Sequence, residues 1–222
     1  VYTFPKMGEK AYFIAIPTSS GTGSEVTPFA IITDADTGVK WPITDYELMP
    51  NMAIVDVDNA MTAPKGLTSA SGIDVMTHAI EAYVSTANSD YTDPLALHAI
   101  EMIQHDLIDS YNGDMAKRDS MHNAQCLAGM AFSNALLGIV HSMAHKTGAA
   151  FSTGHIPHGC ANAIYLPYVI KYNAKDPVAA SRYAEIARRM GLAGTSEQAL
   201  INSLVEKIDE FNVRLNIPKT LK

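Results

Sequence analysis

Four histidines and one aspartate stand at spacings that suit a bound metal ion. Asp74 and His78 are four residues apart, and so are His141 and His145, so each pair shares one face of a helix. His158 follows on a segment rich in Gly and Pro, which we expect to be a loop. One carboxylate and three imidazoles suit a divalent transition-metal ion and leave a position for substrate. The spacing therefore predicts a metal centre drawn from these segments.

The alternative is that each histidine is an ordinary core or surface residue with local hydrogen bonds. We assign His98, His105 and His122 to that class, because none of them has a partner at ligand spacing. No His-Glu-x-x-His sequence occurs, which excludes the zincin pattern, and no Gly-x-Ser-x-Gly supports a serine hydrolase. The two cysteines, Cys126 and Cys160, show no metal-binding or redox spacing.

A loop rich in Gly and hydroxyl groups, residues 17–25, follows a short apolar run. Its backbone N–H groups and hydroxyls are of the kind that hold phosphate or ribose. Gly21 and Gly23 are not followed by the third Gly of a dinucleotide-binding fingerprint, because Val26 stands there, and no Walker A sequence exists. Taken alone, the loop is better explained as an ordinary turn into a hairpin.

Composition narrows the class of protein. The 222 residues are 47% hydrophobic and 18% charged, which is typical of a folded globular chain. A net charge of −7 and the lack of a Lys/Arg run argue against a nucleic-acid partner. No run of 18 apolar residues predicts a membrane span. Two cysteines make no disulfide framework, so we expect a cytoplasmic protein.

Hydrophobic patterning predicts strands first and helices afterwards. The expected strands are residues 11–16, 29–33, 39–43 and 52–56, the second and third forming a hairpin. The expected helices are residues 71–85, 93–107, 118–138, 179–190 and 196–212. The fold class is therefore an α/β remnant, residues 1–63, followed by an all-α domain, residues 64–222.

Read together, the motifs resemble the iron-containing (group III) alcohol dehydrogenase family. The matching segments, in order, are residues 16–27, 72–83, 138–145 and 155–163. Residues 4–8 and 142–146 look closest to the alcohol dehydrogenase part of bifunctional aldehyde-alcohol dehydrogenases, with stand-alone butanol-type enzymes also similar. The resemblance implies the dehydroquinate-synthase-like fold, with a dinucleotide-binding α/β domain and a helical metal-binding catalytic domain.

The resemblance also implies an activity and residue roles. The reaction would be interconversion of a primary alcohol and an aldehyde by hydride transfer to or from NAD, or NADP, with Fe²⁺ or Zn²⁺ as the metal. His145 would border substrate and relay a proton without binding the ion. The metal would be held by Asp74, His78, His141 and His158. The dinucleotide would be lined by Thr18, Gly21, Thr22, Thr27, Lys40 and Phe132. A small alcohol or aldehyde is the expected partner, and a homo-oligomer is the expected assembly.

Two departures from the family pattern matter. The separation of His141 and His158 is longer than usual because of extra residues around 152–154, so His155 would compete with His158 for the metal. The Gly-rich phosphate loop expected before Val1 and the closing helices expected after Lys222 lie outside the sequence. We therefore expect a fragment of a longer enzyme. Alternative functions are an inactive metal-binding or assembly module, or a dehydroquinate-synthase-like enzyme.

Overall fold

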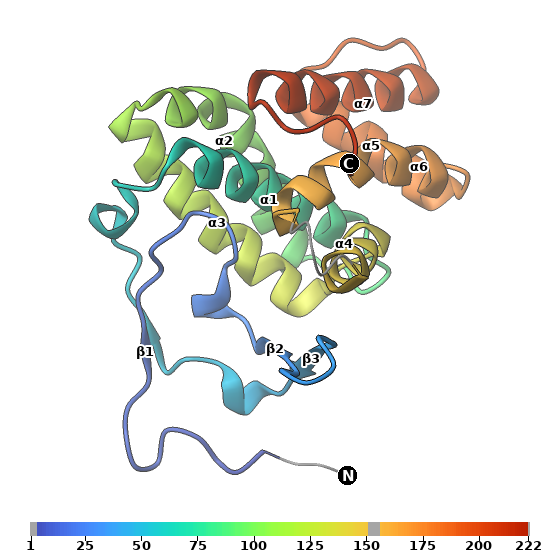
Figure 1. Cartoon of the computed structure of the whole chain (residues 1–222). Coiled ribbons are helices and arrows are strands. Elements are labelled where there is room, and N and C mark those ends of the chain that lie inside the picture. Colours follow the sequence, from blue (N-terminus) through green and yellow to red (C-terminus); the bar gives the residue numbers. More distant parts are fainter. Residues whose placement is uncertain (1–3, 151–155, 222) are drawn as a thin grey trace.

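The computed structural model describes residues 4–150 and 156–221. Short strands come first along the chain and a bundle of helices follows (Figure 1). The strands are β1 (Ile14–Ala15), β2 (Phe29–Thr33), β3 (Lys40–Thr44) and β4 (Met52–Ala53). The helices are α1 (Lys65–Val84), α2 (Thr92–Asn112), α3 (Met115–Ala135), α4 (Ile139–Ala150), α5 (His158–Asn173), α6 (Pro177–Arg189) and α7 (Glu197–Arg214). Among the described residues, no single helix is long and apolar enough to cross a membrane.

The strands form two separate pairs. β2 and β3 make the expected antiparallel hairpin, in which Phe29 pairs with Thr44 and Thr33 with Lys40. Asp34 shapes its turn by accepting hydrogen bonds from the backbone N–H groups of Asp36 and Thr37. The strands expected over residues 11–16 and 52–56 shorten to the two-residue parallel pair of β1 and β4. Before β1, the backbone N–H of Phe13 donates to the side-chain oxygen of Asn51 and so takes no part in the strand pairing. After β1, Pro17 has no N–H group to donate to a neighbouring strand.

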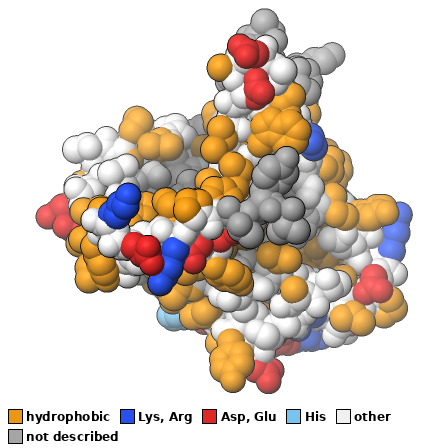
Figure 2. All heavy atoms as spheres, turned by 90° about the horizontal axis from the view of Figure 1, so that it is seen from below, with side chains coloured by type: hydrophobic (Ala, Val, Ile, Leu, Met, Phe, Trp, Pro, Cys, Tyr) orange, Lys and Arg blue, Asp and Glu red, His pale blue; other side chains and the backbone are white. Residues whose placement is uncertain are grey.

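Large hydrophobic side chains remain exposed along this N-terminal part. Figure 2 shows hydrophobic side chains spread over the face of the molecule seen from below, toward which the strands lie in Figure 1. The exposed residues of this part include Tyr12, Phe13, Ile14, Ile16, Ile31, Ile32 and Trp41. The hydrophobic core lies instead among the helices.

Helix α1 is the centre of that core. It packs against α2, α3 and α5, and Ile73, Met76 and Ile80 on it are fully buried. It begins at Lys65, six residues before the predicted start at Ser71. These polar first turns are helical although the hydroxyls of Ser69 and Ser71 donate to backbone carbonyls of the preceding turn, a bond that slightly weakens a helix. A helix buried on nearly all sides is a rigid base for side chains that must converge.

Helix α5 was not among the predicted helices, and the loop expected at His158 is wrong. His158 is the first residue of α5, directly after Pro157. Gly159 at the start and Pro167 in the interior explain the error, because both residues lower intrinsic helix propensity. Tertiary packing overrides that preference, since most of the first turns of α5 are buried against α1.

Candidate metal centre

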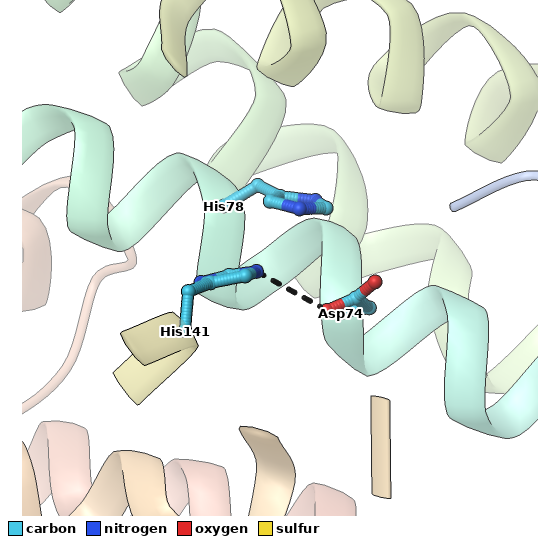
Figure 3. A group of neighbouring side chains, drawn as sticks. All are labelled: Asp74, His78 and His141. Carbon is cyan, nitrogen blue, oxygen red and sulfur yellow. Dashed lines mark ion pairs between the residues drawn. The ribbon is translucent and has the colours of Figure 1, made fainter. Parts of the chain in front are cut away.

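Asp74 and His78 lie one turn apart on α1, and His141 on α4 faces them (Figure 3). All three are buried, and one ligand-type atom of each lies within 4.8 Å of the others. The Nε2 atom of His141 is 3.5 Å from Oδ1 of Asp74. Two ligands bound tetrahedrally at about 2.1 Å from one ion are about 3.4 Å apart, so this distance suits shared coordination.

His158 reaches the same group from α5. Its Nε2 atom lies 3.9 Å from Oδ1 of Asp74, and its side chain is 39% exposed. Gly159 makes this approach possible, because a Cβ there would come within 1.9 Å of the carbonyl oxygen of Ala70 on α1. Only glycine lets the backbone of α5 lie so close to α1. The predicted ligands therefore converge in space, while the competing residue, His155, lies outside the described residues.

Glu81 orients His141, a role that was not predicted from the sequence. The carboxylate accepts hydrogen bonds from Nδ1 of His141 at 2.6 Å and from the backbone N–H groups of Val140 and His141. With Nδ1 donating to Glu81, the lone pair of Nε2 points toward Asp74, which is the arrangement that ligating histidines have in metal sites. Gly138 leaves room for the carboxylate, since a Cβ there would be 2.7 Å from Oε1.

Asn162 is a second residue of the site that was not predicted from the sequence. It is fully buried on α5, one turn after His158. Its amide nitrogen donates to Oδ1 of Asp74 at 2.6 Å and lies 3.1 Å from Nε2 of both His141 and His158. Asn162 thus holds the carboxylate of Asp74 in place, and Glu81 holds the imidazole of His141.

The charges of the group shift its proton affinities. Burial lowers the pKa of His78 to about 3, so its imidazole is neutral. Burial also disfavours charge on His141, but the Asp74 and Glu81 carboxylates outweigh it and raise the pKa of His141 to about 9. Burial alone would raise the pKa of Asp74, yet the neighbouring imidazoles hold it below its usual range. Near neutral pH the site without an ion therefore combines the negative charge of Asp74 with a neutral His78 and a protonated His141.

This donor set fits a divalent transition ion. Nδ1 of His78 is buried and has no hydrogen-bond partner among the described residues, which leaves a ring nitrogen in the group without a protein donor or acceptor. Nitrogen and carboxylate ligands together suit iron or zinc better than magnesium or calcium, which prefer oxygen alone.

A proton and a divalent ion compete for Nε2 of His141. Because its pKa of about 9 lies above neutrality, binding of an ion at pH 7 has to release about one proton. We expect the apparent affinity for Zn²⁺ to rise about tenfold per pH unit from pH 6.5 to 8.5 and to level off near pH 9. Calorimetric titrations in buffers of different ionisation enthalpy measure the released proton. An affinity that stays constant over this range would contradict the assignment.

A cavity of about 270 Å³ opens beside the group. The candidate ligands form one wall, and Phe29, Phe132, Leu136 and Leu137 make much of the rest apolar. His145 also lines it, with its ring centroid 4.8 Å from that of His158 and 6.4 Å from that of His141. His145 thus borders the cavity, as expected of a residue that faces a substrate.

Three of the six predicted dinucleotide residues line the same cavity: Thr22, Thr27 and Phe132. The ring of Phe132 stacks on His78 at 4.4 Å between centroids. Thr18 and Gly21 do not line the cavity; Gly21 packs against α1, where a Cβ would lie 2.6 Å from Cβ of Ser71. The side chain of Lys40 lies outside the described part of the chain.

The loop that carries these threonines is fixed to α3. Gln125 accepts a hydrogen bond from the backbone N–H of Gly23 at 2.8 Å and donates to the buried carboxylate of Glu25 at 2.6 Å. Gly23 has φ +61° and its backbone packs against Gly129 of α3. These contacts hold the loop in a fixed position, where it forms one wall of the cavity. The sequence alone had favoured an ordinary turn.

The sequence of the chain matches known protein families and relatives. The sequence model described as "Fe-containing alcohol dehydrogenase family, C-terminal" matches residues 68–222, and that described as "Iron-containing alcohol dehydrogenase" matches residues 2–57. The chain is 56% identical over 221 residues to the NADPH-dependent butanol dehydrogenase of Clostridium saccharobutylicum, covering all of the chain and 56% of that protein. It is 45% identical over 240 residues to the bifunctional aldehyde-alcohol dehydrogenase AdhE of Escherichia coli K12, of which it covers 27%.

Solved structures show the same fold. The iron-containing alcohol dehydrogenase of Thermococcus thioreducens superposes with a TM-score of 0.84 at 40% identity, over 93% of this chain and 51% of that one. A 1,3-propanediol oxidoreductase gives 0.87 at 36% identity, over 94% and 54%. The chain thus spans about half the length, or less, of the relatives it matches. It belongs to the iron-containing alcohol dehydrogenase family.

Proposed function

We propose that this chain forms the metal-binding part of an NAD(P)-linked oxidoreductase that interconverts a primary alcohol and an aldehyde. The observation that carries the proposal is the buried group of Asp74, His78 and His141 at the wall of a largely apolar cavity. Support also comes from the relatives, which are named as alcohol dehydrogenases. No observation on the described residues specifically favours the two alternatives, an assembly module or a dehydroquinate-synthase-like enzyme.

Asp74, His78, His141 and His158 would hold the ion, which we propose is Fe²⁺ or Zn²⁺. When bound, the ion supplies the positive charge that lowers the pKa of an alcohol hydroxyl toward neutrality. Glu81 keeps Nε2 of His141 turned toward the site, and Asn162 keeps the carboxylate of Asp74 in place. The apolar wall at Phe29, Phe132, Leu136 and Leu137 excludes water and binds the alkyl group of the substrate.

His145 would move the hydroxyl proton. Its imidazole lies one helical turn from His141 and is partly exposed, so one ring nitrogen can accept a proton inside the cavity and the ring can pass it to solvent. The carbon-bound hydrogen would leave as hydride to the nicotinamide, which we place against Phe132 and the threonines Thr22 and Thr27. Thr18, Gly21 and Lys40 remain proposed contacts to the rest of the dinucleotide, NAD or NADP.

Anaerobic loading with Fe²⁺ or Zn²⁺, followed by a primary alcohol and NAD⁺ or NADP⁺, tests the proposal through the absorbance of the reduced cofactor. We expect His145→Ala to retain the metal content of the unsubstituted protein and to lose turnover by about 10²–10⁴-fold, the usual contribution of a proton-transfer group. His141→Ala serves as the comparison and should lose both metal and turnover. A loss of metal from His145→Ala as large as that from His141→Ala would show that His145 is a ligand instead.

A further inference from the structure

Leu136 has a backbone conformation that leucine rarely adopts. It follows the last residue of α3 with φ +65° and ψ −176°, a region populated almost entirely by glycine. Among the described residues, Asn216 is the other non-glycine with positive φ. Asparagine adopts positive φ more readily than other non-glycine residues because its short polar side chain can hydrogen-bond locally, whereas leucine gains no such hydrogen bond. Leu136 is therefore the strained position of the fold.

The strain is held from both sides. The N–H of Leu136 donates to the carbonyl of Phe132 at 2.8 Å, which fixes the end of α3. Four residues later, the N–H of Val140 donates to Glu81 at 2.8 Å, which fixes the start of α4. The axes of the two helices turn by 101° between these points. These contacts fix the backbone on both sides of residue 136. Any residue at this position therefore has to adopt the same strained backbone conformation.

The side chain of Leu136 is also poorly buried. It is 51% exposed, although leucine gains stability mainly from burial. It lines the cavity together with Phe132, Leu137, His145 and the candidate ligands. A residue that is strained and half-exposed contributes little to the stability of the turn. Its side chain instead faces the cavity that it lines.

We propose that Leu136 is a specificity-determining residue, whose side chain limits the space for the alkyl group of the alcohol. This rests on the proposed function, because it assigns the cavity to the substrate. The isobutyl group would favour short, unbranched primary alcohols by closing the apolar wall formed by Phe29, Phe132 and Leu137. A smaller side chain would open that wall to longer or branched chains.

Two substitutions separate the strain from the side chain. Leu136→Gly removes both, and we expect its melting temperature to rise by about 2–6 °C, because glycine adopts this conformation freely. Leu136→Ala trims the side chain but keeps a Cβ at positive φ, so no such rise is expected. Both variants should raise kcat/KM for 1-hexanol relative to ethanol by about tenfold or more.

Asn216→Gly is the matched control, because Asn216 is the other non-glycine residue with positive φ among those described. Its side-chain amide donates a hydrogen bond to the hydroxyl of Tyr111, and it does not line the cavity. It should leave the ratio of the two alcohols unchanged. An unchanged ratio in active Leu136→Gly and Leu136→Ala proteins would overturn the inference alone. Lack of metal-dependent turnover of any primary alcohol by the unsubstituted oxidoreductase of which this chain forms the metal-binding part would instead overturn the proposed function, and this inference with it.

Discussion

Asp74→Asn is expected to lower the affinity for Zn²⁺ or Fe²⁺ by more than about 100-fold, while the chain keeps its fold. Asp74 supplies the negative charge of the group, and it stands within 3.9 Å of both His141 and His158. The amide has nearly the same shape but carries no charge to offset that of the ion, and loss of a supporting contact alone costs metal sites about 10–100-fold. Calorimetry and metal analysis after dialysis measure the change.

Asp106→Asn is the control for this substitution. Asp106 is a buried carboxylate on α2 that is paired with Lys117 at 2.6 Å, apart from the candidate ligands. We expect this variant to lose stability, because an ion pair is broken, and to bind the metal as the unsubstituted protein does. If Asp74→Asn and Asp106→Asn changed metal affinity alike, Asp74 would not be a ligand.

Glu81→Ala is expected to have the largest effect on stability. It removes the acceptor for Nδ1 of His141 and for two backbone N–H groups at the start of α4, all of them buried. Breaking a buried charge pair from one side costs about 3–5 kcal/mol of the free energy of unfolding. Metal affinity should fall about 10–100-fold as well, because His141 loses the partner that fixes its ring.

Urea denaturation with and without Zn²⁺ separates the two effects of Glu81→Ala. Glu81→Gln keeps an acceptor oxygen for the backbone donors but loses the charge, so it should recover part of the stability and little of the metal affinity. Glu185→Ala, which changes a partly exposed carboxylate on α6 that pairs with Arg188 and Arg189, should alter neither quantity appreciably. Zn²⁺ affinity of Glu81→Ala equal to that of the unsubstituted protein would refute the positioning role of Glu81.

The helical pairs Asp74/His78 and His141/His145 could be identified as metal-site candidates from the sequence because their signal is local, whereas the choice of ligands among them and His158 came from the family resemblance. A spacing of four residues places Asp74 beside His78, and no knowledge of the fold is needed to see it. The hairpin and most helices were predictable for the same reason, since periodicity and turn residues are read within a short window. The fold class is confirmed by the structures that superpose on the chain.

The supporting residues were missed because their roles depend on helices that the sequence pattern hid. Asn162 stands one turn after His158, but this spacing has meaning only if residues 158–173 are helical, and Gly159 and Pro167 argue locally against that. Glu81 stands seven residues after Asp74 and so continues its helix face, a signal that was available. Its partner at the start of α4, however, is fixed only by tertiary packing.

The candidate ligands come from three helices, α1, α4 and α5, that are far apart along the chain. An ion bound to all of them acts as a cross-link between those segments and binds the native chain far better than the unfolded one. By mass action, free ion at about 100 times its dissociation constant adds about 2.7 kcal/mol to the free energy of unfolding. The supply of metal in the cell would then set how long the protein survives proteolysis.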